Sequence, residues 1–186
     1  LPDQSPVGEE IESMKVIQQM TKVQIDTIKK SWQKVKAFGF DKTSEVVFQI
    51  LFSRAPHLKE FFQLRGGKNM QGSKTIHVFG RVVENLDSLQ IVQQYFKKLG
   101  QDHVKYGLKP QYFDLFGEVL IQSLRHIIKE DFTEEVEHGW KIAYTFIRDL
   151  MVGDNYDHDQ ICELCQRPSP IFLVGQDNAI MRMQEK

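Results

Sequence analysis

The chain has 186 residues, of which 41% are hydrophobic and 11% aromatic, including thirteen phenylalanines. This length and composition allow one domain with a sizeable core and some extension. The formal net charge of −1 argues against a general electrostatic affinity for nucleic acid, and no apolar run approaches the ~18 residues of a membrane span. Two cysteines cannot form a disulfide scaffold for such a domain, which favours a reducing, cytoplasmic setting.

The first twenty residues are mostly polar, with one short helical candidate at 11–17. They show no initiator methionine, basic region or apolar stretch typical of a secretion signal, so we expect a processed chain or a piece of a longer one. The domain is predicted to start at Thr21, because residues 21–24 fit a capping box. Gly39 ends the first helix, whose apolar residues at helical spacing are Val23, Ile25, Ile28, Trp32 and Val35.

A second helix is predicted from Asp41, which can cap it, to a corner at Ala55-Pro56. Proline disfavours a helical conformation in the residue before it and can itself begin a new helical turn. After Gly66-Gly67, a flexible break, the next helix is predicted over about 68–86. The apolar side of the second helix carries Val46, Val47, Ile50, Leu51 and Phe52, with Phe48 on a neighbouring face.

Three further helices are predicted after residue 86. Asp87 or Ser88 can cap a helix over about 89–104, and Pro110 opens a helix that runs to Ile128 with a wide apolar face. Residues 131–134 resemble a second capping box before the last helix, which carries Trp140. No segment within 21–152 alternates as a strand does. The sequence therefore predicts one all-α domain over 21–152, with extensions at 1–20 and 153–186.

Pro56 is followed six residues later by Phe62, and residues 99–103 read Leu-Gly-Gln-Asp-His. In this order and spacing, these and further motifs resemble those of the globin family, in particular a cytoglobin-like or invertebrate globin-like haem domain. Pro56 and Phe62 resemble the family's proline corner and haem-packing phenylalanine. Residues 82–86 (Val-Val-Glu-Asn-Leu) are similar to the end of the distal helix, and residues 99–103 (Leu-Gly-Gln-Asp-His) to the approach to the proximal histidine. The start of the next helix at 110–113 and Trp140 add to a resemblance that spans residues 21–152.

The resemblance implies a haem b whose iron is held by His103 as the proximal ligand. A neutral imidazole offers one nitrogen to iron, while the other carries the proton and donates it to a carbonyl or carboxylate. Leu99 lies one turn earlier on the same face, so both can touch the porphyrin. Phe62 is expected to stack on the porphyrin and Phe48 to narrow the distal pocket, unless both simply pack in the core. The remaining candidate haem contacts are Phe113 and Phe116.

The distal side departs from the family pattern, which most often has a histidine there. Counting back from residues 82–86 without gaps puts Gln71 at that place, with Thr75 one turn later on the same face. A glutamine can donate a hydrogen bond to bound dioxygen but is a poor iron ligand, so the sixth position would be open. His77 is the alternative distal ligand, although it lies about 240° around an ideal helix from Gln71 and would bring Arg81 against the haem. A bis-histidyl haem would favour redox or sensing roles over storage.

The predicted function is haem-based binding or sensing of dioxygen or another diatomic gas. The extensions favour sensing over storage and offer surfaces for a protein partner or a second copy. The alternative is a haem redox protein or an enzyme of the nitric oxide dioxygenase type, for which nothing in the chain supplies electrons. A non-haem interaction domain is less favoured because His103 is present. Cys162 and Cys165 form a lone C-x-x-C: two unrelated cysteines, a redox-responsive pair, or with His158 part of a zinc site.

Overall fold

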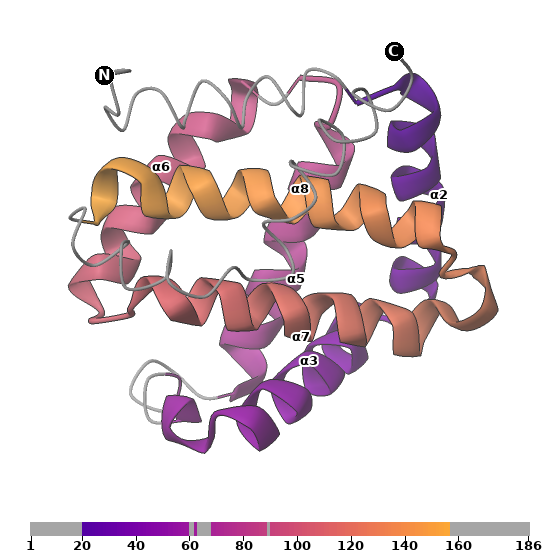
Figure 1. Ribbon diagram of the computed structural model, residues 1–186. Coiled ribbons are helices and arrows are strands. Elements are labelled where there is room, and N and C mark those ends of the chain that lie inside the picture. The colour runs from indigo at the N-terminus through magenta and orange to yellow at the C-terminus, as the bar shows by residue number, and fades with distance from the viewer. Residues whose placement is uncertain (1–19, 60–61, 63–67, 89, 157–186) are drawn as a thin grey trace, which may run out of the picture. The chain divides into compact units, whose positions relative to one another are not determined.

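The computed structural model describes residues 20–59, 62, 68–88 and 90–156, and the helices account for most of them (Figure 1). The α-helices are α2 (Lys22–Phe38), α3 (Phe40–Arg54), α5 (Lys68–Glu84), α6 (Gln90–Lys105), α7 (Pro110–Ile128) and α8 (Glu134–Val152). Short 3₁₀-helices cover Pro56–Leu58, Lys129–Asp131 and Gly153–Asn155. No strand occurs in the described residues, so the all-α class predicted from the sequence is confirmed. Within that part of the chain, none of the helices combines the length and the apolar character needed to cross a bilayer.

The described residues divide into two compact units. The first, here called the α3–α5 unit, comprises residues 22–92 and 118–139. The second, here called the His103 unit, comprises residues 93–117 and 140–156 together with residues 20–21. The helices α6, α7 and α8 each contribute residues to both units.

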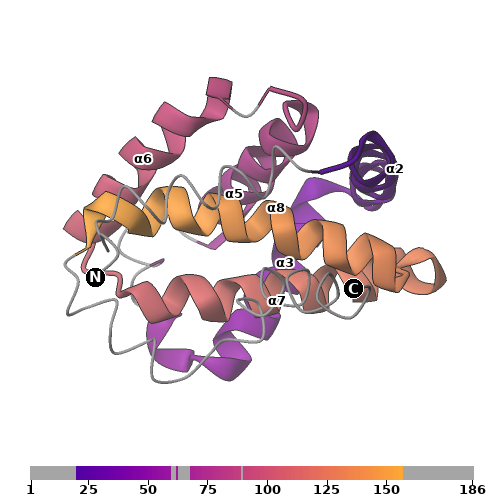
Figure 2. The ribbon, with the colours of Figure 1, turned by 45° about the horizontal axis from the view of Figure 1, so that its top comes forward.

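In the α3–α5 unit, α2 and α3 both pack on α5 (Figure 2). The side chain of Trp32 in α2 is 1% exposed. A Cβ atom placed on Gly80 of α5 would lie 3.3 Å from the Cζ2 atom of this indole. At the start of α8, a Cβ on Gly139 would lie 3.0 Å from Cγ1 of Ile28 in α2. The absence of a side chain at Gly80 and at Gly139 therefore lets α5 and the start of α8 pack directly against α2, as closely as in a typical protein core.

Gly39, rather than Asp41, sets the start of α3. Its φ of 98° lies in the left-handed region, which glycine adopts without steric penalty. The Gly39 carbonyl accepts hydrogen bonds from the backbone nitrogen and the hydroxyl of Thr43, at 2.9 and 2.8 Å. The helix begins at Phe40, so the prediction that Asp41 caps it is wrong. Asp41 lies in the first turn, where a carboxylate still interacts favourably with the helix dipole.

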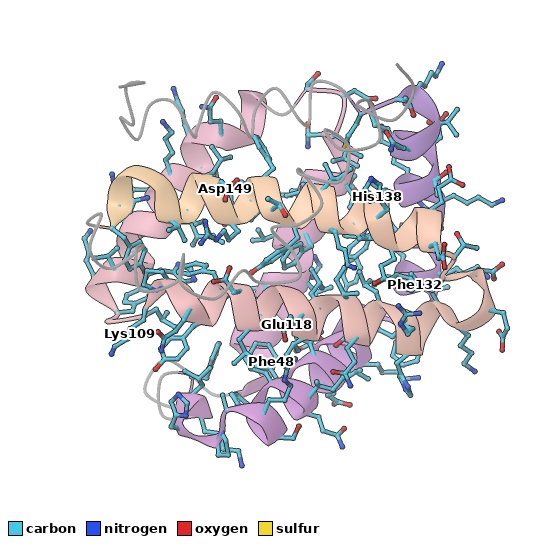
Figure 3. The ribbon with its side chains drawn as sticks, viewed as in Figure 1. Phe48, Lys109, Glu118, Phe132, His138 and Asp149 are labelled. Carbon is cyan, nitrogen blue, oxygen red and sulfur yellow. The ribbon has the colours of Figure 1, made fainter. Side chains whose placement is uncertain are left out.

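The start of α8 also differs from the prediction. Thr133 Oγ1 accepts a hydrogen bond from the backbone nitrogen of Val136 at 3.3 Å, which makes Thr133 the N-cap. Asp131 belongs to the preceding 3₁₀-helix and forms an ion pair with Lys34 of α2. The capping box predicted over 131–134 is therefore wrong. Phe132 in the same turn (Figure 3) packs under the Arg125 guanidinium, which lies 5.2 Å from the ring centroid.

Candidate functional site

The predicted proximal ligand His103 lies in the last turn of α6, within the His103 unit. Its imidazole is half-buried, and Nδ1 lies 2.7 Å from the carbonyl oxygen of Leu99, one turn earlier. Because a carbonyl can only accept, Nδ1 carries the proton and Nε2 carries the lone pair of the neutral ring. This is the tautomer in which Nε2 can coordinate a metal ion, with Leu99 holding the ring in orientation.

Asp102, the neighbour of His103, takes part in a separate surface network. Its Oδ1 atom lies 3.3 Å from Nζ of Lys105 and 3.4 Å from Nζ of Lys98. The hydrogen bond from Lys105 lowers the pKa of the Asp102 carboxyl, and the charge of Lys98 acts in the same direction. Both lysines are largely exposed, so this network contributes little to stability.

Two aromatic rings lie beside the His103 imidazole. The buried ring of Phe113 in α7 has its centroid 5.5 Å from that of His103, at an interplanar angle of 43°. Tyr106 lies 6.1 Å away at 48°. Phe113 was predicted as a haem contact, and the structure places it against the imidazole. Phe116, predicted in the same role, is half-buried and stacks on Tyr144 at 6.4 Å.

Tyr144, Arg148 and Asp114, which were not predicted from the sequence, make contacts between α8 and α7 at and beside Phe113. Tyr144 of α8 donates its hydroxyl proton to the Phe113 carbonyl, and burial raises the pKa of this tyrosine far above its usual value. Arg148, one turn further along α8, donates from Nε to Oδ1 of Asp114 at 3.3 Å. The available signal was a tyrosine and an arginine at i and i+4 on a helix whose other inward residues are apolar.

The end of the described chain packs on the same residues. Tyr156 donates a hydrogen bond from its hydroxyl to the carbonyl of Leu108 at 2.8 Å, and its ring meets Phe113 edge-on at 6.0 Å. Burial raises the pKa of Tyr156 to about 12. Asn155 Nδ2 donates to the Lys97 and Met151 carbonyls at 3.3 and 3.0 Å. Both residues follow Val152, the predicted end of the domain, yet they pack against α6, α7 and α8.

Phe48, predicted to narrow the distal pocket, and Phe62, predicted to stack on the porphyrin, both belong to the α3–α5 unit. Phe48 of α3 (Figure 3) is 4% exposed, and its ring lies 4.8 Å from that of Phe62 at an angle of 73°. Phe52, one turn after Phe48, lies 5.5 Å from Phe48 and 5.6 Å from Phe62. The structure thus brings Phe48 and Phe62 together, with Phe52 as a third member. From the sequence, Phe52 was predicted only to lie on the apolar side of its helix.

The distal candidates Gln71, Thr75 and His77 all lie on α5. Thr75 is half-buried next to the buried Ile76, whereas the side chain of Gln71 lies outside the described residues. His77 is exposed, and its ring meets the Phe40 ring edge-on at 4.6 Å. Phe40 and Phe48 lie two turns apart on α3, or about 12 Å along its axis. His77 therefore contacts α3 well away from the Phe48–Phe62 pair.

The cysteine pair Cys162 and Cys165 lies outside the described residues, as does His158. In the part of the chain that the structure covers, no three histidine, cysteine, aspartate or glutamate side chains form a group that could hold a metal ion.

Comparison with known proteins adds three findings. A family model described as globin matches residues 46–151. The flavohemoprotein of Vibrio cholerae is 24% identical over 136 residues (72% of this chain and 34% of that protein), and an uncharacterized globin-like protein of Aquifex aeolicus is 26% identical over 128 residues (69% and 88%). The crystal structure of a hexacoordinated heme protein from an anhydrobiotic tardigrade superposes with a TM-score of 0.64 at 18% identity, covering 72% of this chain and 93% of that one. The chain spans about a third or less of the length of the flavohemoproteins that it matches.

Proposed function

The chain belongs to the globin family, and on that premise we propose that it binds haem b through His103 and uses the iron to bind or sense dioxygen or another diatomic gas. The single observation that carries the proposal is the hydrogen bond between His103 Nδ1 and the Leu99 carbonyl. It leaves the lone pair on Nε2, as an axial iron ligand requires. Relatives named as haem proteins support the choice of cofactor.

The residues present fit a haem group in their chemistry. A protein that binds haem b through a histidine must supply an imidazole nitrogen for the iron and apolar side chains around the porphyrin. Within the His103 unit, the buried ring of Phe113 supplies apolar surface and His103 supplies the nitrogen. When bound, the haem would provide a ferrous iron with affinity for diatomic gases. The protein would hold the iron through His103, keep the imidazole oriented through Leu99, and exclude water with its phenylalanines.

The cofactor is tested by comparing wild type with His103→Gly after reconstitution with hemin. We expect wild type to bind one haem with a sharp absorption band, His103→Gly to hold it poorly, and added free imidazole to restore the band. His126→Gln is the matched control, because His126 is an exposed histidine on α7 and should bind haem as wild type does. A His103→Gly protein with the wild-type spectrum would refute the assignment.

The distal residue is tested by the ferrous spectrum without added ligand. A five-coordinate spectrum supports Gln71 at the distal position, and Gln71→Leu should then release dioxygen roughly tenfold faster, because one hydrogen bond of about 1.4 kcal/mol is lost. A six-coordinate spectrum that reverts to five-coordinate in His77→Ala would instead identify His77 as the ligand. The similarity to a hexacoordinated heme protein makes this second outcome worth testing.

A redox enzyme of the nitric oxide dioxygenase type is the second candidate, because the similar proteins include flavohemoproteins. The matched region is only a third or less of those proteins, so the test supplies the electrons separately. Consumption of nitric oxide by the haem-loaded protein, given dioxygen, NADH and a separate flavoprotein reductase, would support this function. Consumption no faster than with free hemin would reject it.

A further inference from the structure

The His103 unit contains a buried ion pair that the proposed function does not use. The side chains of Arg148 and Asp114 are 9% and 12% exposed, and Arg148 also lies 3.1 Å from Oδ1 of Asp149. Removing two charges from water costs several kcal/mol per ion, so such a pair is weak evidence for stability. Where it sits in the fold is more informative than the energy it could contribute.

The pair connects α8 to the first turns of α7, and a hydrogen bond beside it does the same. Tyr144 donates to the carbonyl of Phe113, and Arg148 binds the carboxylate of Asp114, the next residue along the chain. A carbonyl has two lone pairs, so Phe113 can accept from Tyr144 and still take part in its own helix. Two consecutive residues of α7 are thus tied to two residues on one face of α8.

Phe113 is the residue through which these contacts reach the His103 imidazole. Its ring lies 5.5 Å from that of His103, while Tyr156 supports the ring at 6.0 Å. The terminal side-chain torsion of histidine is intrinsically broad. In this structure, the Leu99 carbonyl fixes the imidazole through Nδ1 and Phe113 lies beside the ring. Movement of Phe113 would therefore widen the range of angles open to the ring.

We propose that Tyr144 and the Arg148–Asp114 pair are positioning residues that set the orientation of the His103 imidazole through Phe113. The proposal rests on the proposed function, since it assigns to this network the geometry with which His103 holds haem iron. None of the three residues is assigned a direct contact with the cofactor. Loss of outer partners of a metal-binding histidine typically weakens metal binding by 10–100-fold.

Two variants test the network. Tyr144→Phe removes one hydroxyl, and the double variant Arg148→Met with Asp114→Leu removes both charges of the buried pair, so that neither is left without the other. The control is Arg125→Met with Glu137→Leu, which removes a more exposed ion pair between α7 and α8 in the α3–α5 unit. If Tyr144→Phe fails to fold, Arg148→Lys tests the network through the Arg148–Asp114 contact while keeping the charge.

Three measurements report on the imidazole and on how firmly it holds the haem. In the haem-free protein, we expect the Nδ1 proton of His103 to exchange with water roughly tenfold faster in the network variants than in wild type, as measured by NMR. In the ferrous haem complex, we expect the iron–histidine stretching band to shift or broaden, and haem to dissociate roughly tenfold faster. The control variant should match wild type in all three measurements.

The outcomes separate this inference from the proposed function. Network variants with lowered stability but wild-type proton exchange and an unchanged iron–histidine band would overturn the positioning role and leave haem binding intact. A wild-type protein that takes up no haem would overturn the proposed function. In that case the proton exchange of the haem-free protein would still decide whether the network orients His103.

Discussion

Gly100→Ala perturbs a close approach of α6 to α8 in the His103 unit. A Cβ atom on Gly100 would lie 2.2 Å from the Met151 carbonyl oxygen, 2.8 Å from Met151 Cα and 2.5 Å from Asn155 Nδ2. Ordinary van der Waals contact begins at 3.4 Å, so the site is too narrow by roughly 1 Å. Two of the three atoms belong to the backbone and cannot move away by rotating a side chain.

The expected cost follows from three contributions. Overpacking a filled site costs about 1–3 kcal/mol. Displacing Asn155 breaks its hydrogen bonds to Lys97 and Met151, worth about 1 kcal/mol each. In the opposite direction, replacing glycine by alanine inside a helix stabilises the helix by about 1 kcal/mol. We therefore expect Gly100→Ala to lower the free energy of unfolding by about 3 kcal/mol, near the upper range for a single substitution.

Urea unfolding followed by circular dichroism measures this loss. Gly153→Ala is the matched control, because nothing lies within 4 Å of a Cβ at Gly153, two residues beyond Met151. The control should stay within about 0.5 kcal/mol of wild type. Gly100 lies three residues before His103, so the variant should also lose haem faster. Equal stability of the two alanine variants would refute the packing argument.

Three further substitutions give distinct expectations. Folding raises the pKa of the Tyr156 phenol from 10.0 to about 12, so the free energy of unfolding should fall as the pH rises from 10 towards 12. In Tyr156→Phe this fall should be smaller, as measured by urea unfolding at pH 9 and 11, although Tyr144 still contributes to it. An unchanged fall between these two pH values would contradict the raised pKa of Tyr156. Thr133→Ala should cost about 1 kcal/mol by removing the N-cap of α8, whereas Thr133→Ser should not; equal melting temperatures would count against the cap. Phe48→Ala should lower the free energy of unfolding by about 3–4 kcal/mol, because it leaves a cavity in the Phe48–Phe52–Phe62 cluster. Phe48→Leu should lower it by an intermediate amount. A decrease below about 1 kcal/mol for Phe48→Ala, measured by chemical unfolding, would show that these rings are not packed as described.

The sequence alone determined the helices, because their signals are local. Pro56 opens a 3₁₀-turn and Pro110 opens α7, as their missing backbone donors allow. Gly39 separates α2 from α3, as predicted. The errors concern which residue caps a helix. Asp131 was predicted to cap α8 but pairs with Lys34, 97 residues away in the chain, and Thr133 takes the cap.

The tertiary structure decided which side chains surround His103. The Leu99 carbonyl is one turn away, so a hydrogen-bonding partner of that kind could be expected from the helix itself. The contacts of Phe113 with Tyr144 and of Asp114 with Arg148 join residues 31 and 34 positions apart. Helical periodicity indicates which face of a helix is apolar. It does not say which residue of another helix will meet that face, because this depends on how all the side chains fill the space between the helices.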